Sequence, residues 1–101
     1  NKLEKEQGGR PSEVAEQSYR KALAAMRAGD LALAEGELKA AIANSPWYPK
    51  AHYTLGQIYA RTERISQAID ELKMAVRMDR FDYEAHMALG LIYKKQFAGA
   101  E

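Results

Sequence analysis

Two histidines, His52 and His86, are the residues whose type and spacing could most readily carry out chemistry. They lie 34 residues apart, at equivalent places in two similar stretches of sequence. A repeated fold would bring them near each other, and paired imidazoles can ligate zinc or exchange protons. The sequence offers no third ligand, and a large ring at a repeated position is more often a packing residue. We therefore expect no metal site and no cofactor.

Other patterns that carry chemistry are missing from the sequence. The chain has no cysteine, which excludes disulfides, thiolate catalysis and cysteine-based zinc sites. It has no glycine-rich phosphate loop, no His-Glu-x-x-His helix and no Gly-x-Ser-x-Gly turn. Carboxylates such as Glu37 and Asp70 fall on the polar side of predicted helices, where they keep a surface hydrated. We expect the protein not to be an enzyme.

Length and composition predict a single soluble domain. The 101 residues are 47% hydrophobic and 29% charged, which is ordinary for a globular protein. Fifteen Lys and Arg against fourteen Asp and Glu give a net charge of +1, so no overall field attracts nucleic acid. No apolar run reaches the roughly 18 to 20 residues that a membrane-spanning helix needs. We expect no nucleic-acid partner, no membrane insertion, and a location in the cytoplasm rather than the periplasm, although composition leaves the compartment open.

The elements that would position any site repeat with a period of 34 residues. Residues 51–59 recur at 85–93, and residues 34–41 recur at 68–75. The residues that recur are Ala51, His52, Leu55, Gly56, Ile58 and Tyr59 in one stretch and Ala34, Glu37, Leu38, Lys39 and Ala41 in the other. Their spacing is typical of helices with one buried side. With breakers at Gly29-Asp30 and Ser45-Pro46, we expect five helices, near 13–28, 31–44, 48–61, 65–78 and 82–97.

The same period divides the chain into units. We expect a polar N-terminal linker or tail over residues 1–12 and a repeat domain over 13–101. The domain comprises one repeat at 15–48, a second at 49–82 and a partial repeat at 83–101. Because the chain begins with Asn1 rather than Met, we expect a processed product or a piece of a longer protein.

These residues resemble the tetratricopeptide repeat family. The series His52-x2-Leu55-Gly56-x2-Tyr59, followed by Ala68-x3-Leu72, fits the 34-residue pattern of that family with His in place of the usual Trp. The resemblance implies an all-α fold in which antiparallel helix hairpins stack as a right-handed α-solenoid. It also implies a scaffold or adaptor module, whose concave groove holds a peptide or helix of a partner protein.

The family's groove positions, carried over to this chain, place apolar and aromatic side chains on the groove floor and cations at its edges. The groove residues are Tyr19, Arg20, Leu23, Met26, Arg27, Lys50, Tyr53, Gln57, Arg61, Met87, Leu91 and Lys94. Cations attract carboxylates, so we expect an acidic, amphipathic peptide or protein as the partner. Cations near the C-terminal ends of helices also complement the helix dipole, which leaves a purely structural role open for each of them.

The last predicted helix leaves an apolar side uncovered. Leu89, Ile92 and Tyr93 should face a second helix, but only residues 97–101 follow. Repeat proteins need about three units and a polar cap to be stable. Either the polypeptide continues beyond Glu101, or another copy covers this self-association face. The alternative function is therefore a structural oligomerisation unit of a larger assembly.

Overall fold

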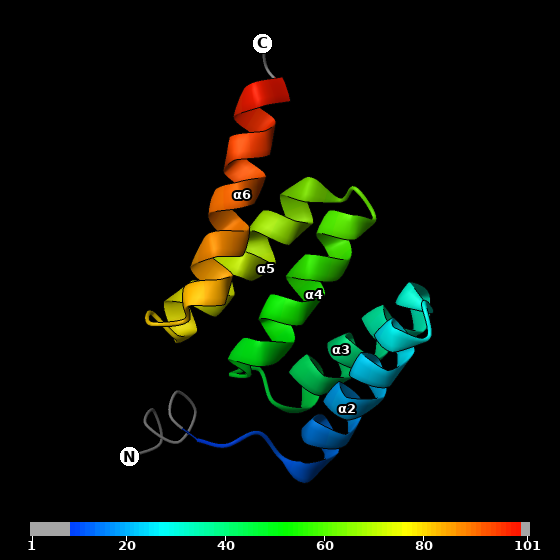
Figure 1. Cartoon of the computed structure of the whole chain (residues 1–101). Helices are drawn as coiled ribbons and strands as arrows, with labels where there is room; N and C mark the ends of the chain where they lie inside the picture. Colours follow the sequence, from blue (N-terminus) through cyan, green and yellow to red (C-terminus); the bar gives the residue numbers. More distant parts are fainter. Residues whose placement is uncertain (1–8, 100–101) are drawn as a thin grey trace.

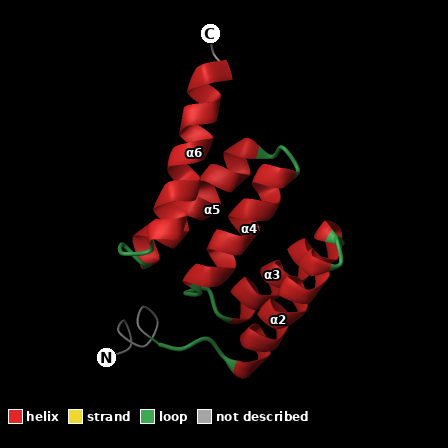
Figure 2. Ribbon diagram, in the orientation of Figure 1, coloured by secondary structure: helices red, strands yellow, loops and turns green. Residues whose placement is uncertain are grey.

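The computed structural model describes residues 9–99, and these form five α-helices and no strand (Figures 1 and 2). The helices are α2 (Glu13–Arg27), α3 (Leu31–Asn44), α4 (Pro49–Arg61), α5 (Ile65–Met78) and α6 (Tyr83–Gly99). Each predicted helix ends within two residues of these bounds, so the all-α prediction is confirmed. Residues 1–8 of the predicted tail and the last two residues of the predicted partial repeat lie outside the described residues.

Side chains that precede the helices fix where most of them begin. Ser12, Asp30 and Asp82 each accept a hydrogen bond from the backbone N–H three residues later, at 3.1, 3.1 and 3.2 Å. Such caps satisfy N–H groups that have no partner inside the helix. Helix α4 instead begins with Pro49, which has no N–H to satisfy. The local sequence therefore determines where α2, α3, α4 and α6 begin.

The turns inside the two complete hairpins share one backbone conformation. Gly29, between α2 and α3, has φ of 84°, and Glu63, between α4 and α5, has φ of 62°. These residues lie 34 positions apart, so the turn repeats with the sequence. Glycine adopts this left-handed conformation freely, whereas a side chain there costs on the order of 1 kcal/mol. Glu63 adopts this conformation although it carries a side chain.

The helices follow one another in chain order from α2 to α6, each antiparallel to the next, as Figure 1 shows. The smallest extent of the molecule is 18 Å, which leaves room for two layers of helices about 10 Å thick. In the first two hairpins a first helix (α2, α4) is paired with a second helix (α3, α5), and α6 follows as a further first helix.

Small side chains let the paired helices approach closely. Leu38 and Leu72, on the two second helices, are fully buried, and so are Ala22 and Ala34. At Gly56 the two helices approach closely, because an added Cβ would lie 2.9 Å from Cγ of Leu72 and 3.3 Å from the carbonyl oxygen of Ala68. The core is thus built where a second helix covers a first helix.

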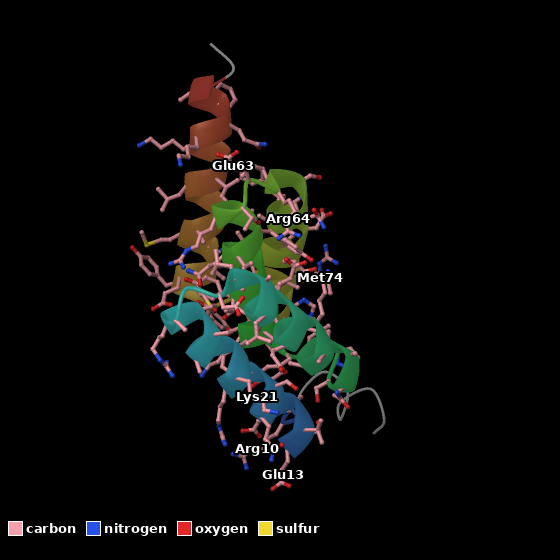
Figure 3. All side chains as sticks on the ribbon, turned by 90° about the vertical axis from the view of Figure 1, so that its right-hand side faces the viewer. Arg10, Glu13, Lys21, Glu63, Arg64 and Met74 are labelled. Atoms are coloured by element: carbon pink, nitrogen blue, oxygen red, sulfur yellow. The ribbon has the colours of Figure 1, made fainter. Side chains whose placement is uncertain are left out.

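An ion-pair cluster joins the first hairpin to the second. The carboxylate of Glu35 on α3 accepts hydrogen bonds from the guanidinium of Arg64, one of them at 3.1 Å, and lies 2.9 Å from Nζ of Lys39. The hydrogen bond from Arg64, followed by that from Lys39, lowers the pKa of Glu35 to about 2. Arg64, labelled in Figure 3 beside Glu63, also lies 4.7 Å above the ring centre of Tyr59. The turn of the second hairpin is therefore held to α3 of the first.

We predict opposite effects of alanine at two repeat-equivalent glycines. Gly56→Ala should lower the free energy of unfolding by on the order of 1 kcal/mol, because overpacking against Leu72 exceeds the gain in helix propensity. Gly90→Ala is the matched control. Nothing lies within 4 Å of a Cβ at Gly90, so this change should raise the free energy of unfolding by up to about 1 kcal/mol. Urea denaturation measures both values, and equal stabilisation by the two substitutions would contradict the packing described above.

Candidate functional site

A hollow opens where the three first helices α2, α4 and α6 meet. It has a volume of about 660 Å³ and is open to solvent. Its walls come from the middle of α2, from α4, and from the turn before α6 with the first residues of that helix. The lining residues are Tyr19, Leu23, Met26, Lys50, Tyr53, Thr54, Gln57, Asp79, Phe81, Asp82, Tyr83 and Glu84.

The structure brings half of the twelve expected groove residues together in this hollow. These are Tyr19, Leu23, Met26, Lys50, Tyr53 and Gln57. The other six line no part of it and are exposed: Arg20, Arg27, Arg61, Met87, Leu91 and Lys94. The hollow thus covers the α2 and α4 parts of the expected groove and ends at the start of α6.

Sequence reasoning missed the part of the lining that precedes and begins α6. Asp79, Phe81 and Tyr83 were assigned no site role, although Phe81 is 93% exposed and Tyr83 is 72% exposed. Their position directly before a first helix could have indicated them, because the turn that leads into a first helix lies beside the preceding first helix. Large aromatic rings at such exposed positions are candidates for partner contact.

The floor of the hollow is formed by ordered aromatic and apolar side chains. The ring of Tyr19 lies 5.3 Å from that of the buried Tyr48, and Met26 packs against the core. Nε2 of Gln57 donates a hydrogen bond of 3.0 Å to the hydroxyl of Tyr53, which orients the phenol. Burial, followed by the negative charges of Glu84 and Asp82, raises the pKa of Tyr53. The phenol therefore stays neutral, and its O–H proton can be donated to a ligand.

A model of the tetratricopeptide repeat family matches residues 14–92, which is most of the chain. The chain belongs to the tetratricopeptide repeat family. Such repeats generally mediate protein–protein interaction and are typically not catalytic. A comparison with curated protein sequences found no significant match. In the part of the chain that the structure describes, no helix is both long and apolar enough to cross a membrane.

The charges of this tetratricopeptide repeat hollow are mixed. Among the described residues, Lys50 is the one cation in the lining, beside the carboxylates of Asp79, Asp82 and Glu84. Two of these carboxylates also order the backbone, because Asp79 accepts a hydrogen bond from the N–H of Phe81 and Asp82 caps α6. The other cations expected at the edge of the groove, Arg20, Arg27, Arg61 and Lys94, are not among the residues that line the hollow. The interior of the hollow is therefore more acidic than the sequence led us to expect.

One member of the expected basic edge has a local partner. The guanidinium of Arg20 lies 3.7 Å from the carboxylate of Glu16 one turn earlier, and its side chain is 74% exposed. An exposed pair of this kind contributes little to stability. The pair with Glu16 therefore does not hold the guanidinium of Arg20 firmly in place.

The two repeat histidines have structural surroundings rather than the geometry of a metal site. His52 is 6% exposed, with Nδ1 2.7 Å from Oε1 of Glu71 and Nε2 2.9 Å from the carbonyl oxygen of Pro46. Both neighbours are acceptors, so both ring nitrogens donate and the imidazole has no lone pair left for a metal. Nε2 of His86 lies 3.0 Å from the carbonyl oxygen of Arg80. Within residues 9–99, no group of three or more His, Asp or Glu side chains is arranged to hold a metal ion.

We predict that the His52–Glu71 pair makes stability depend on pH above 6.5. Burial lowers the pKa of His52, but the hydrogen bonds to Glu71 and Pro46 outweigh it, and the net pKa is raised above the usual 6.5. A raised pKa means that the stabilisation is complete below pH 6.5 and is lost as the pH rises through the folded-state pKa. Chemical denaturation across this range should show the loss. At pH 6, Glu71→Gln should cost about 1 to 3 kcal/mol and flatten the pH profile.

Asp70→Asn is the matched control for this prediction. Asp70 precedes Glu71 on α5 but is exposed, so its substitution should leave both the stability and its pH profile within about 0.5 kcal/mol of the parent. A Glu71→Gln variant with the same pH profile as the parent would show that His52 is not held as an imidazolium.

Proposed function

We propose that the chain is a non-catalytic protein-interaction module that binds an amphipathic segment of a partner protein in the hollow between α2, α4 and the start of α6. The observation that carries this proposal is the convergence of Tyr19, Leu23, Met26 and Tyr53 on one open hollow of about 660 Å³. A volume of that order falls within the range of about 300 to 1,000 Å³ seen for ligand sites. The repeat units 15–48, 49–82 and 83–101 supply one first helix each to this surface.

The chemistry of the floor favours apolar anchors on the partner. Tyr19 and Tyr53 offer large rigid rings that lose little conformational freedom when they are covered. Leu23 and Met26 add a deformable apolar surface, since the unbranched thioether of methionine adapts to different shapes. The exposed side chains of Met87 and Leu91, 45% and 59% accessible, extend the apolar surface along α6 for a longer partner segment.

The charges favour a partner segment of mixed charge, which amends the acidic ligand inferred from the sequence alone. Arg20, Arg27, Arg61 and Lys94 still supply exposed cations that attract carboxylates from outside the hollow. Inside the hollow, carboxylates outnumber the single cation. We infer a segment that places basic side chains toward the turn before α6 and acidic side chains toward the outer cations.

We predict that truncating the floor abolishes binding of selected peptides. Random peptides displayed on phage and selected against the whole chain should combine apolar anchors with charges of both signs. The double variant Met26→Ala, Tyr53→Ala should lose at least about tenfold in affinity for them, because truncating a buried anchor costs about 2 kcal/mol or more. Isothermal titration calorimetry with synthetic copies of the selected peptides measures the loss.

A matched control uses apolar side chains away from the hollow. Val14 and Leu33 are 55% and 52% exposed and line no part of it, so their double alanine variant should bind the same peptides unchanged. Circular dichroism confirms that each variant keeps its helix content. Equal losses in the two double variants, or peptides insensitive to both, would place the binding surface elsewhere.

A second candidate function, self-association through the face expected at Leu89, Ile92 and Tyr93, is favoured by the exposure of α6. Tyr93 is 42% exposed and Phe97 is 80% exposed, whereas Tyr59, which is equivalent to Tyr93 in the preceding repeat, is 4% exposed. Ile92 already packs partly against the core, so the face available to another copy is centred on Leu89 and Tyr93. Covering exposed apolar surface in this way is a common origin of homodimers.

For self-association we predict a mass above 11.3 kDa in light scattering coupled to size exclusion. Tyr93→Glu should return the mass to that of one chain, because a carboxylate buried in an apolar contact is unfavourable. Leu33→Glu, at an exposed site on α3, should leave the mass of the parent. A mass of 11.3 kDa at every concentration of the parent would rule out self-association.

A further inference from the structure

The stretch of chain that leads into α2 is tied to the loop before α4. The backbone N–H of Ser12 donates a hydrogen bond of 2.9 Å to Oγ of Ser45, and Oγ of Ser45 donates one of 3.4 Å to Oγ of Ser12. Ser12 has an extended backbone, and Pro11 disfavours a helical conformation at the residue before it. Helix α2 therefore begins here, and the preceding residues turn toward the start of α4 (Figure 1).

A second, smaller hollow connects these residues to the first one. This side hollow has a volume of about 320 Å³ and is lined by Arg10, Pro11, Glu16, Tyr48, Pro49, Lys50 and Asp79. Lys50 and Asp79 also line the hollow between α2, α4 and α6, so the two hollows adjoin. The described residues begin at Gly9, directly before Arg10. Residues 1–8 are therefore attached at the edge of the proposed binding site.

Residues 1–8, which lie outside the described residues, are long enough to cross the hollow. An extended chain advances about 3.3 Å per residue, so eight residues span up to about 26 Å. Along α4 the hollow extends from Lys50 to Gln57, which is about 10 Å at a helical rise of about 1.5 Å per residue. The length of the segment therefore allows it to reach Met26 and Tyr53 on the floor.

The sequence of this segment has the mixed charge that the hollow favours. Residues 1–8 read Asn-Lys-Leu-Glu-Lys-Glu-Gln-Gly, with one apolar side chain among charged and polar ones. Alternate residues of an extended chain share a side, which puts Leu3 and Lys5 together and Glu4 and Glu6 opposite them. Leu3 suits the apolar floor, and the ammonium group of Lys5 suits the carboxylates that line the hollow.

We propose that residues 1–8 occupy the hollow of their own chain and compete with partner segments for it. Leu3 packs on the floor beside Leu23 and Met26, and Lys5 pairs with a carboxylate of the turn before α6. This inference rests on the proposed function of the hollow and adds an internal competitor to it.

The tether makes weak contacts sufficient for this competition. A short connection gives the segment an effective concentration on the order of 1 mM at the hollow. A contact too weak to hold a free peptide therefore fills the hollow in a large share of the molecules. A partner then binds with an affinity reduced by the fraction of chains whose hollow is free. The same segment acts on every partner that uses the floor.

The test detects the position of the segment in the whole chain. The sequence has no cysteine, so Asn1→Cys provides a single attachment point for a nitroxide spin label, which broadens the NMR signals of nearby nuclei. Isotope-labelled methionine methyl groups are the reporters. Met26 lines the hollow, whereas Met74 on α5, labelled in Figure 3, does not. The Met26 signal should lose most of its intensity relative to the chemically reduced label, and the Met74 signal should keep its intensity.

Two matched substitutions of Leu3 test the apolar anchor in the spin-labelled chain. Leu3→Ser removes the anchor without adding charge, so it should restore the Met26 signal. Leu3→Ile keeps an apolar side chain of the same size and should leave the broadening of the parent. Without the spin label, Leu3→Ser should also bind the peptides selected for the hollow at least about threefold more tightly than the parent, because the internal competitor is weakened.

Other results would overturn the proposal. Equal broadening of Met26 and Met74, or broadening of Met26 that persists in Leu3→Ser, would mean that the segment has no preferred place in the hollow. Broadening of Met26 in a mixture of spin-labelled chains and separate isotope-labelled chains would assign the occupant to a second copy. The spin-label measurement contains no partner, so it can fail while peptides still bind in the hollow. Peptides insensitive to substitutions in the floor would instead contradict the proposed function.

Discussion

The seating of a second helix on a first helix is the constraint on which the rest of this structure depends. Between α4 and α5, Leu72 packs on Gly56 with no room for a side-chain carbon between them. The close approach lets Leu72 and Ile58 be fully buried in a molecule only two helices thick. In so small a core, apolar area removed from water is the main favourable term, and it depends on this short distance between backbones.

Polar contacts fix the relative positions of the helices that pack in this apolar core. The ring of His52 forms hydrogen bonds at both nitrogens, one to Glu71 on α5 and one to the carbonyl group of Pro46. These bonds connect α4 to α5 and to the loop before α4. The cluster of Glu35, Lys39 and Arg64 ties the turn of the second hairpin back to α3. Because these bonds connect elements distant in sequence, they fix how the hairpins stack. The stacking in turn sets the spacing of α2 and α4, and hence the width of the hollow.

Each first helix has two sides with different tasks. One side is covered by a second helix, and the other faces the hollow. In α4 both sides can be identified, because Gly56 packs against Leu72 of α5, whereas Tyr53 and Gln57 line the hollow. Helix α6 presents the same two sides with the first uncovered. The two sides of each first helix therefore follow from one repeated packing arrangement.

The sequence by itself determined the helices, their order and the family. Caps such as Ser12 and Asp30, the glycine at position 29 and the 34-residue spacing of Gly56 and Gly90 are local or periodic signals. These signals predicted the ends of the five helices to within two residues, because helix propensity, capping and apolar periodicity all favour the same boundaries. Tyr19, Leu23 and Tyr53 were assigned to the groove by the resemblance to the family, whose groove positions they occupy, and they line the hollow.

Only the tertiary structure decided the contacts between residues distant in the chain. The carboxylate that pairs with His52 comes from 19 positions away, and Glu35 meets Arg64 across 29 positions. The acidic wall of the hollow likewise comes from a turn, where Asp79 and Asp82 are carried toward Tyr53 by the stacking of α6 on α5. Periodicity reports which side of a helix a residue occupies. It does not report which neighbour the other helices bring to that side, because that neighbour is set by packing distances and crossing angles that no local pattern encodes.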